Sequence, residues 1–115
     1  SEESSAHQAF KQVVVDAKEG DTQLTLKELA PVRLIKNKFY NDLQELYKTG
    51  PTTEQLKELL GRARAKRGMF EGDLEDGELE IGQITGLIHN IKPVAQIVKE
   101  MVAEFNEAKI QVNSF

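Results

Sequence analysis

The chain has no cysteine and no tryptophan, and only two histidines and three prolines among its 115 residues. Without cysteine it can form no disulfide, no thiolate metal site and no cysteine nucleophile. Long hydrophobic runs are also missing, since no apolar stretch approaches the ~20 residues needed to cross a bilayer, and no charged segment followed by an apolar one opens the chain. We therefore expect a soluble, cytoplasmic protein that makes no contact with a membrane.

Charge of one sign is in slight excess, with 19 acidic and 15 basic side chains and a net charge of −4. A nucleic-acid role would need a local basic patch, and basic side chains gather only at Arg62, Arg64, Lys66 and Arg67. Two interpretations of this cluster stay open: a solvated basic helix end, which suits the helix dipole, and a docking site for an acidic partner. We expect no nucleic-acid partner.

The spacing of apolar residues predicts a mostly helical chain with one short strand near its beginning. A serine at position 4 or 5 can cap a first helix that runs to about Glu19, with Gly20 at its C-terminal cap. The side chains of residues 21–26 alternate instead, which predicts a strand. One side of that strand would carry Thr22, Leu24 and Leu26.

Two further amphipathic segments follow, separated by Gly50. The first predicts a helix that begins at Pro31, or nearer Asn37, and ends at Gly50. In the second, Thr52 and Gln55 stand at capping-box spacing, and the helix is expected to end near Gly68.

Glycines at positions 72, 77 and 82 break the helical period between Met69 and Gln83, so this stretch is expected to be irregular, with Glu78–Ile81 as the other possible strand. A short helix can run from Gln83 to about Asn90, and Pro93 opens a last helix with a continuous apolar stripe. The predicted fold class is mainly α, with four to five helices and one or two short strands, in a single region covering residues 1–115.

The titratable side chains form no catalytic or metal-binding pattern. His7 and His89 lack partners at ligand spacing, so we expect no metal site and assign both to structural or surface positions. The acidic run from Asp73 to Glu80 resembles the start of a calcium loop, but its sixth and twelfth positions hold Glu78 and Ile84 where that loop needs Gly and Glu. We therefore expect no catalytic residue in this chain.

Three segments nevertheless resemble one known family. Residues 3–11 (ESSAHQAFK) resemble the segment that follows the last phosphate-binding strand of enoyl-acyl-carrier-protein reductase II and the related 2-nitropropane dioxygenases, or nitronate monooxygenases. Residues 31–37 (PVRLIKN) look like the arginine and lysine-asparagine block of that family, and residues 72–87, with GDLEDG followed by GQITGL, are similar to its C-terminal signature. All three occur in the family's order.

The resemblance implies an FMN-binding (β/α)8 barrel whose catalytic and flavin-binding groups lie upstream of Ser1, so that this chain would be a C-terminal fragment. It implies reduction of an enoyl thioester in fatty acid biosynthesis, with electrons passing from NAD(P)H through FMN to a substrate linked to acyl-carrier protein. The family's other branch would oxidise a small nitronate. No cofactor-binding residue of this chain can be named, and the isolated piece should bind no FMN and show no activity.

The resemblance also implies that Glu80, Ile81, Gly82 and Gln83 line the substrate side of the pocket. The reductase form often has Met-Ala where this chain has Glu80-Ile81, a difference that keeps the nitronate branch open. A rival interpretation is a non-enzymatic helical interaction module, in which the apolar stripes of the first and last helices bind each other or a partner. Because a fragment would lack its contacts with the barrel, we expect exposed apolar surface, and so a homodimer or a self-associating fragment.

Overall fold

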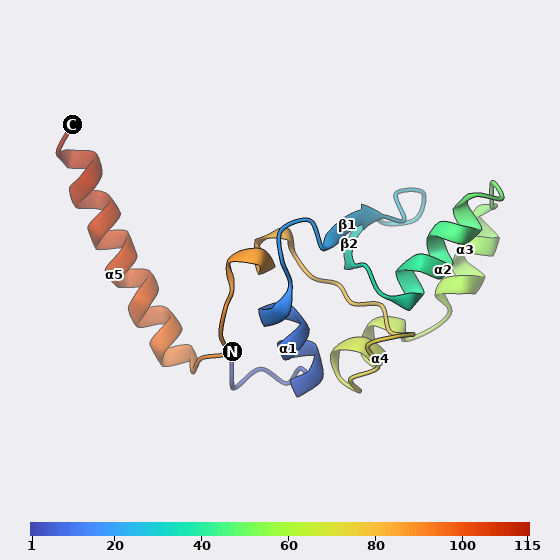
Figure 1. Ribbon diagram of the computed structural model, residues 1–115, viewed down its shortest axis with the longest axis horizontal. Coiled ribbons are helices and arrows are strands. Elements are labelled where there is room, and N and C mark those ends of the chain that lie inside the picture. Colours follow the sequence, from blue (N-terminus) through green and yellow to red (C-terminus); the bar gives the residue numbers. More distant parts are fainter. The chain divides into compact units, whose positions relative to one another are not determined.

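The computed structural model describes every residue, 1–115, and groups them into two compact units. One unit joins residues 1–4 to residues 90–115, and the other comprises residues 5–89. Five α-helices, one 3₁₀ helix and two four-residue strands make up the chain (Figure 1). The prediction of a mainly helical chain with at most two short strands is therefore confirmed.

The larger unit contains an antiparallel pair of strands, β1 (Thr22–Thr25) and β2 (Val32–Ile35). The strand expected at residues 21–26 is present as Thr22–Thr25, but burial does not follow the expected alternation of its side chains. Leu24 is 37% exposed, whereas Thr25 and Leu26 are buried. Leu26 takes a left-handed backbone conformation (φ 54°), which interrupts the regular alternation of a strand at the point where β1 ends.

Strand β2 occupies the residues from which a helix beginning at Pro31 was expected, so that prediction is wrong. Val32 and Ile35 are β-branched and favour extended backbone. Beyond the pairing with β1, the N–H of Ile35 donates to the carbonyl of Leu79 (3.0 Å). Backbone hydrogen bonds on both edges hold these residues as a strand. The other expected strand, Glu78–Ile81, forms only an isolated antiparallel bridge from Glu80 to Leu34.

Helix α2 (Lys38–Tyr47) begins at the alternative start near Asn37, and it ends before Gly50. The Oδ1 of Asn37 accepts a hydrogen bond from the N–H of Tyr40 (3.0 Å), which caps the helix. Its Nδ2 donates to the carbonyls of Leu74 (2.9 Å) and Gly77 (2.8 Å). One side chain therefore starts the helix and also binds the irregular segment that follows Met69.

The capping box predicted at Thr52 is present at the start of helix α3 (Thr53–Leu60). The helix does not reach Gly68, because Gly61 takes a positive φ of 62° and interrupts it. A separate short helix, α4 (Arg64–Met69), follows. Helices α2 and α3 lie side by side (Figure 1), over a core cluster made of Leu26, Leu43 and Leu56.

Helix α1 (Gln8–Asp16) is shorter at both ends than the pattern predicts. Its N-cap is His7 rather than a serine: the Nδ1 of His7 accepts from the N–H of Ala9 (3.1 Å), and the N–H of His7 donates to the carbonyl of Met69 (2.7 Å). Gly20 lies in the loop after the helix and does not cap it. The helix buries Phe10 in a second core cluster.

The stretch between α4 and the 3₁₀ helix η1 (Gln83–Leu87) is irregular, as predicted. Two glycines allow α4 to approach it closely. A Cβ at Gly68 would lie 3.0 Å from the carbonyl oxygen of Glu78, and a Cβ at Gly77 would overlap the backbone of Gly68. This close approach fixes the start of the segment that carries the predicted site residues.

The smaller unit consists of helix α5 (Val94–Asn113) and the residues that bind its start, and it confirms the last predicted helix. The Glu3 carboxylate accepts a hydrogen bond from the N–H of Val94 (2.8 Å). None of the helix's side chains is buried, and Met101 and Phe105 are 62% and 67% exposed. Neither α5 nor any other helix has the length and apolar character needed to cross a bilayer.

Candidate functional site

The site residues implied by the family resemblance lie where an extended segment that contributes to the second core cluster enters η1, whose first residue is Gln83. Leu79 and Ile81 are buried in that cluster. Because side chains alternate along extended backbone, Glu78 and Glu80 share the opposite face of the segment. The structure places the side chain of Ile81 in the core. It leaves three of the four implied residues exposed: Glu80, Gly82 and Gln83.

Glu78 is a buried carboxyl group, with 7% of its surface exposed. Burial raises its pKa from 4.5 to about 7, and the charge of Glu80 and a hydrogen bond to Glu80 add to this rise. The positive charge of Arg64 acts in the opposite direction. Near neutral pH, Glu78 can therefore hold a proton.

Gly82 takes an ordinary extended backbone (φ −69°), and a Cβ built there meets nothing within 4 Å. Nothing in the fold of this chain therefore requires glycine at position 82. The helix that follows is a 3₁₀ helix that ends at Leu87 rather than a helix reaching Asn90. A hydrogen bond joins this 3₁₀ helix to α1: the hydroxyl of Thr85 donates to the carbonyl of Val14 (2.7 Å).

The acidic run ahead of this segment builds a turn. The Oδ1 of Asp73 accepts from the N–H groups of Glu75 (3.3 Å) and Asp76 (3.0 Å), and its Oδ2 accepts from the guanidinium of Arg67 (2.6 Å). The hydrogen bond from the Asp76 N–H is the largest of the influences that lower the pKa of Asp73. Both carboxylate oxygens of Asp73 thus have hydrogen-bonding partners within the chain.

Two arginines of the basic cluster, Arg64 and Arg67, also bind partners within the chain. Arg64 donates to the carbonyls of Leu60 (3.0 Å) and Asp76 (2.9 Å), and its guanidinium lies 4.8 Å from the centre of the Phe39 ring. Arg67 pairs with Asp73. These contacts give two of the four basic residues a structural role that neither interpretation of the sequence included.

Neither histidine joins a group of ionisable side chains. His7 caps α1, and its ring lies where a side chain at Gly72 would have to stand. His89 is exposed beyond η1. No group of three or more His, Asp or Glu side chains is placed to hold a metal ion.

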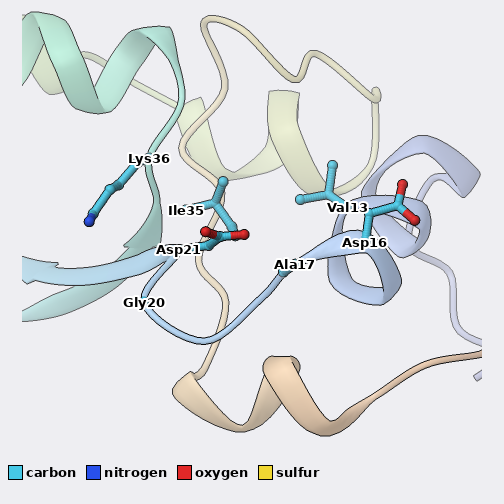
Figure 2. Close-up of a pocket in the computed structure, with 7 residues that line it drawn as sticks. All are labelled: Val13, Asp16, Ala17, Gly20, Asp21, Ile35 and Lys36. Carbon is cyan, nitrogen blue, oxygen red and sulfur yellow. The ribbon is translucent and has the colours of Figure 1, made fainter.

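An open pocket of about 390 Å³ lies between the end of α1, the loop after it and the end of β2 (Figure 2). Its charged lining residues are Asp16, Asp21 and Lys36. Asp16 accepts from the side chain of Gln12 (2.8 Å), and Asp21 accepts from the N–H of Lys18 (2.8 Å). The Lys36 side chain points away from Asp16 (Figure 2). The polar groups therefore do not converge on a common point, and the implied site residues do not line this pocket.

Sequence reasoning missed the roles of Asn37 and Glu78. Asn37 is visible as a helix start, but its hydrogen bonds to a loop nearly 40 residues away depend on the tertiary fold. The alternation of residues 78–81 gives no sign that the glutamate at position 78 is buried. The glycines at 68 and 77 are the only sequence signal of the close approach that buries it.

Comparison with known proteins gives two findings. Residues 1–104 match the family described as nitronate monooxygenase. The chain is also similar to the solved structure of FabK from Thermotoga maritima, with a TM-score of 0.84 and 34% identity over 95% of this chain and 34% of that one. For the M276A mutant of the same protein, the TM-score is 0.78 and the identity 32%, over 95% of this chain and 32% of that one. The chain thus spans about a third of the length of these structures. No curated protein sequence matches it.

Proposed function

The chain belongs to the nitronate monooxygenase family, and from that premise we propose that it is the C-terminal portion of a flavin-dependent enoyl-acyl-carrier-protein reductase. The parent protein would use FMN and NAD(P)H to reduce the double bond of an enoyl thioester carried by acyl-carrier protein. The observation that supports this most strongly is the 34% identity and the TM-score of 0.84 to FabK over 95% of the chain. The family resemblance of residues 3–11, 31–37 and 72–87 is confirmed by the match to residues 1–104.

The residues of this chain do not themselves fit a flavin phosphate. The pocket of Figure 2 presents two carboxylates, which would repel a phosphate group, and the sequence has no glycine-rich phosphate loop. We therefore propose that FMN binds to an upstream (β/α)8 barrel and assign no step of the reaction to this chain. Its part would be to cover the barrel mouth, in a cytoplasmic homodimer.

Within that role, residues 80–83 are proposed to line the substrate side of the pocket. Three of them are exposed, at the point where the chain leaves the core and enters η1. Gly82 supports this proposal, because this chain gives no reason of its own for a glycine there. A substrate or flavin that approaches the backbone closely would supply such a reason.

A nitronate monooxygenase is the second candidate, favoured by the activity for which the matching family is named and by the acidic residue Glu80. The two activities are separated with the purified full-length protein. Enoyl-dependent oxidation of NAD(P)H, measured by absorbance at pH 7, supports the reductase, and oxygen uptake with an alkyl nitronate supports the second candidate. A flavin-loaded protein that does neither contradicts both.

A third candidate is not an enzyme: it is a helical module that binds a partner and has no enzymatic activity. The exposed apolar residues of α5 are the observation in its favour. It predicts that the full-length protein binds no FMN, so a flavin absorbance spectrum of the purified protein decides between this rival and the enzyme. A colourless full-length protein that stays colourless after incubation with FMN would favour the module.

A further inference from the structure

The exposed apolar side chains of α5 follow a heptad repeat, in which the seven positions are lettered a to g. Steps of four and three residues alternate along the helix, and every a and d position is apolar: Val94, Val98, Met101, Phe105, Ala108 and Val112. Such a repeat forms a narrow seam that suits one partner helix, whereas a helix that covers a core usually carries a wider apolar stripe. We call these a and d residues the α5 seam.

Nothing in this chain covers the α5 seam. Val98, Met101 and Phe105 are 53%, 62% and 67% exposed, and the helix has no buried residue. An apolar seam of this length is stable in water only when a second surface covers it.

Two oppositely charged side chains flank the α5 seam. Glu104 occupies a g position, and Lys109 occupies the e position of the next heptad. Neither side chain makes an ion pair within the chain. On the outer face of the helix, by contrast, Glu100 accepts hydrogen bonds from the side chains of Lys92 and Gln96. The two charges beside the seam are therefore available to a second helix.

The positions of these charges favour a second copy of α5 that runs in the same direction. In a parallel pair, a g residue of one helix lies beside the e residue of the next heptad of the other helix. Glu104 then meets Lys109 of the second copy, and two-fold symmetry forms this ion pair twice. In an antiparallel pair, g positions face g positions, so Glu104 near the middle of the helix would meet its own copy and be repelled.

We propose that α5 pairs with α5 of a second copy as a parallel two-stranded coiled coil, in which burial of the α5 seam supplies the attraction and the Glu104–Lys109 pairs set the orientation. The inference rests on the proposed function only for the homodimer, whose interface it names. It does not depend on flavin or on the reaction catalysed.

The test measures the dissociation constant of the dimer by analytical ultracentrifugation of the full-length protein at low ionic strength. Glu104→Lys places lysines opposite one another in both ion pairs, and Lys109→Glu places glutamates there, so each variant should raise the dissociation constant by about tenfold. Mixing the two variants brings opposite charges together at both pairs and should restore the parental affinity. Glu107→Lys is the matched control, because it reverses a charge on the outer face of the same helix and should keep the parental affinity.

The orientation is tested by a cross-link. Ala108→Cys, on the α5 seam, should form a disulfide between two copies under mild oxidation, because equivalent d positions meet only in a parallel pair. Ala103→Cys, on the outer face, is the matched control and should form none. A dimer in which Ala108→Cys does not cross-link overturns the parallel arrangement.

A full-length dimer whose affinity is unchanged by both charge reversals overturns the proposal, and so does a loss of affinity that mixing does not restore. A full-length protein that stays monomeric shows that the rest of the same chain covers the α5 seam, and also overturns it. A protein that passes these tests but binds no FMN contradicts the proposed function alone.

Discussion

The buried carboxyl group of Glu78 predicts that the stability of the chain depends on pH around neutrality. Its pKa is raised from 4.5 to about 7, so between these values the folded chain holds a proton that the unfolded chain has released. The resulting stabilisation is complete below pH 4.5 and is lost as the pH rises through about 7. At ~1.4 kcal/mol per unit, and with some water still reaching the group, the loss amounts to about 2–3 kcal/mol.

Glu78→Gln removes this dependence, since the amide has nearly the shape of the protonated acid and cannot ionise. Urea unfolding of the chain, followed by circular dichroism, should give nearly equal free energies of unfolding for variant and parent at about pH 4.5. At about pH 8 the variant should be more stable by about 2–3 kcal/mol. Glu75→Gln, at an exposed position, should show no such change with pH. A stability difference between Glu78→Gln and the parent that stays constant over this range would refute the reasoning.

Three further predictions concern the fold. Asn37→Ala should lower the free energy of unfolding by about 2–4 kcal/mol, because it removes a helix cap and leaves two loop carbonyls without their donor; urea unfolding measures this, and Asn37→Asp, which keeps the cap but cannot donate, should recover only part of the loss. Gly77→Ala should destabilise the chain by more than about 2 kcal/mol through overlap with Gly68, whereas Gly82→Ala should change stability by less than about 0.5 kcal/mol in the same assay. The isolated chain should self-associate in light scattering through the exposed apolar side chains of α5, and Phe105→Glu should shift it toward the monomer.

Local signals in the sequence predicted those elements whose ends are set by neighbouring residues. The capping box at Thr52, the helix start at Asn37 and the long apolar period after Pro93 all predicted real helices. The strand at residues 32–35 was missed, because its partners lie across a loop at β1 and some 45 residues away at Glu80. An amphipathic pattern cannot reveal hydrogen bonds of that range.

The candidate site could be located from the sequence only through family resemblance. The residues alone gave no catalytic pattern, and residues 78–81 were recognised only as a possible short strand. The burial of Glu78 depends on the glycines that let α4 approach, and on the hydrogen bonds between residues 79–81 and β2. Those are tertiary features, and they determine which of two similar glutamates holds a proton.

Glu80 and Gln83 remain proposed pocket residues whose side chains are exposed in this chain. Gln83 offers a donor and an acceptor to a substrate, so in the full-length enzyme Gln83→Ala would raise KM if it contacts the substrate. Such a variant tests one contact. A substitution at Gly82 tests the whole segment, because the proposed function requires a ligand to approach the backbone closely there.

The most direct test of the central claim is therefore Gly82→Val in the full-length protein, with turnover of an enoyl thioester and melting temperature measured on the same samples. Within this chain a Cβ at position 82 meets nothing within 4 Å and the backbone conformation is ordinary, so stability should be unchanged. If residues 80–83 line the pocket, the added methyl groups enter the space of substrate or flavin, and kcat/KM should fall by about tenfold or more. Parental kinetics in a normally stable Gly82→Val enzyme would contradict the claim.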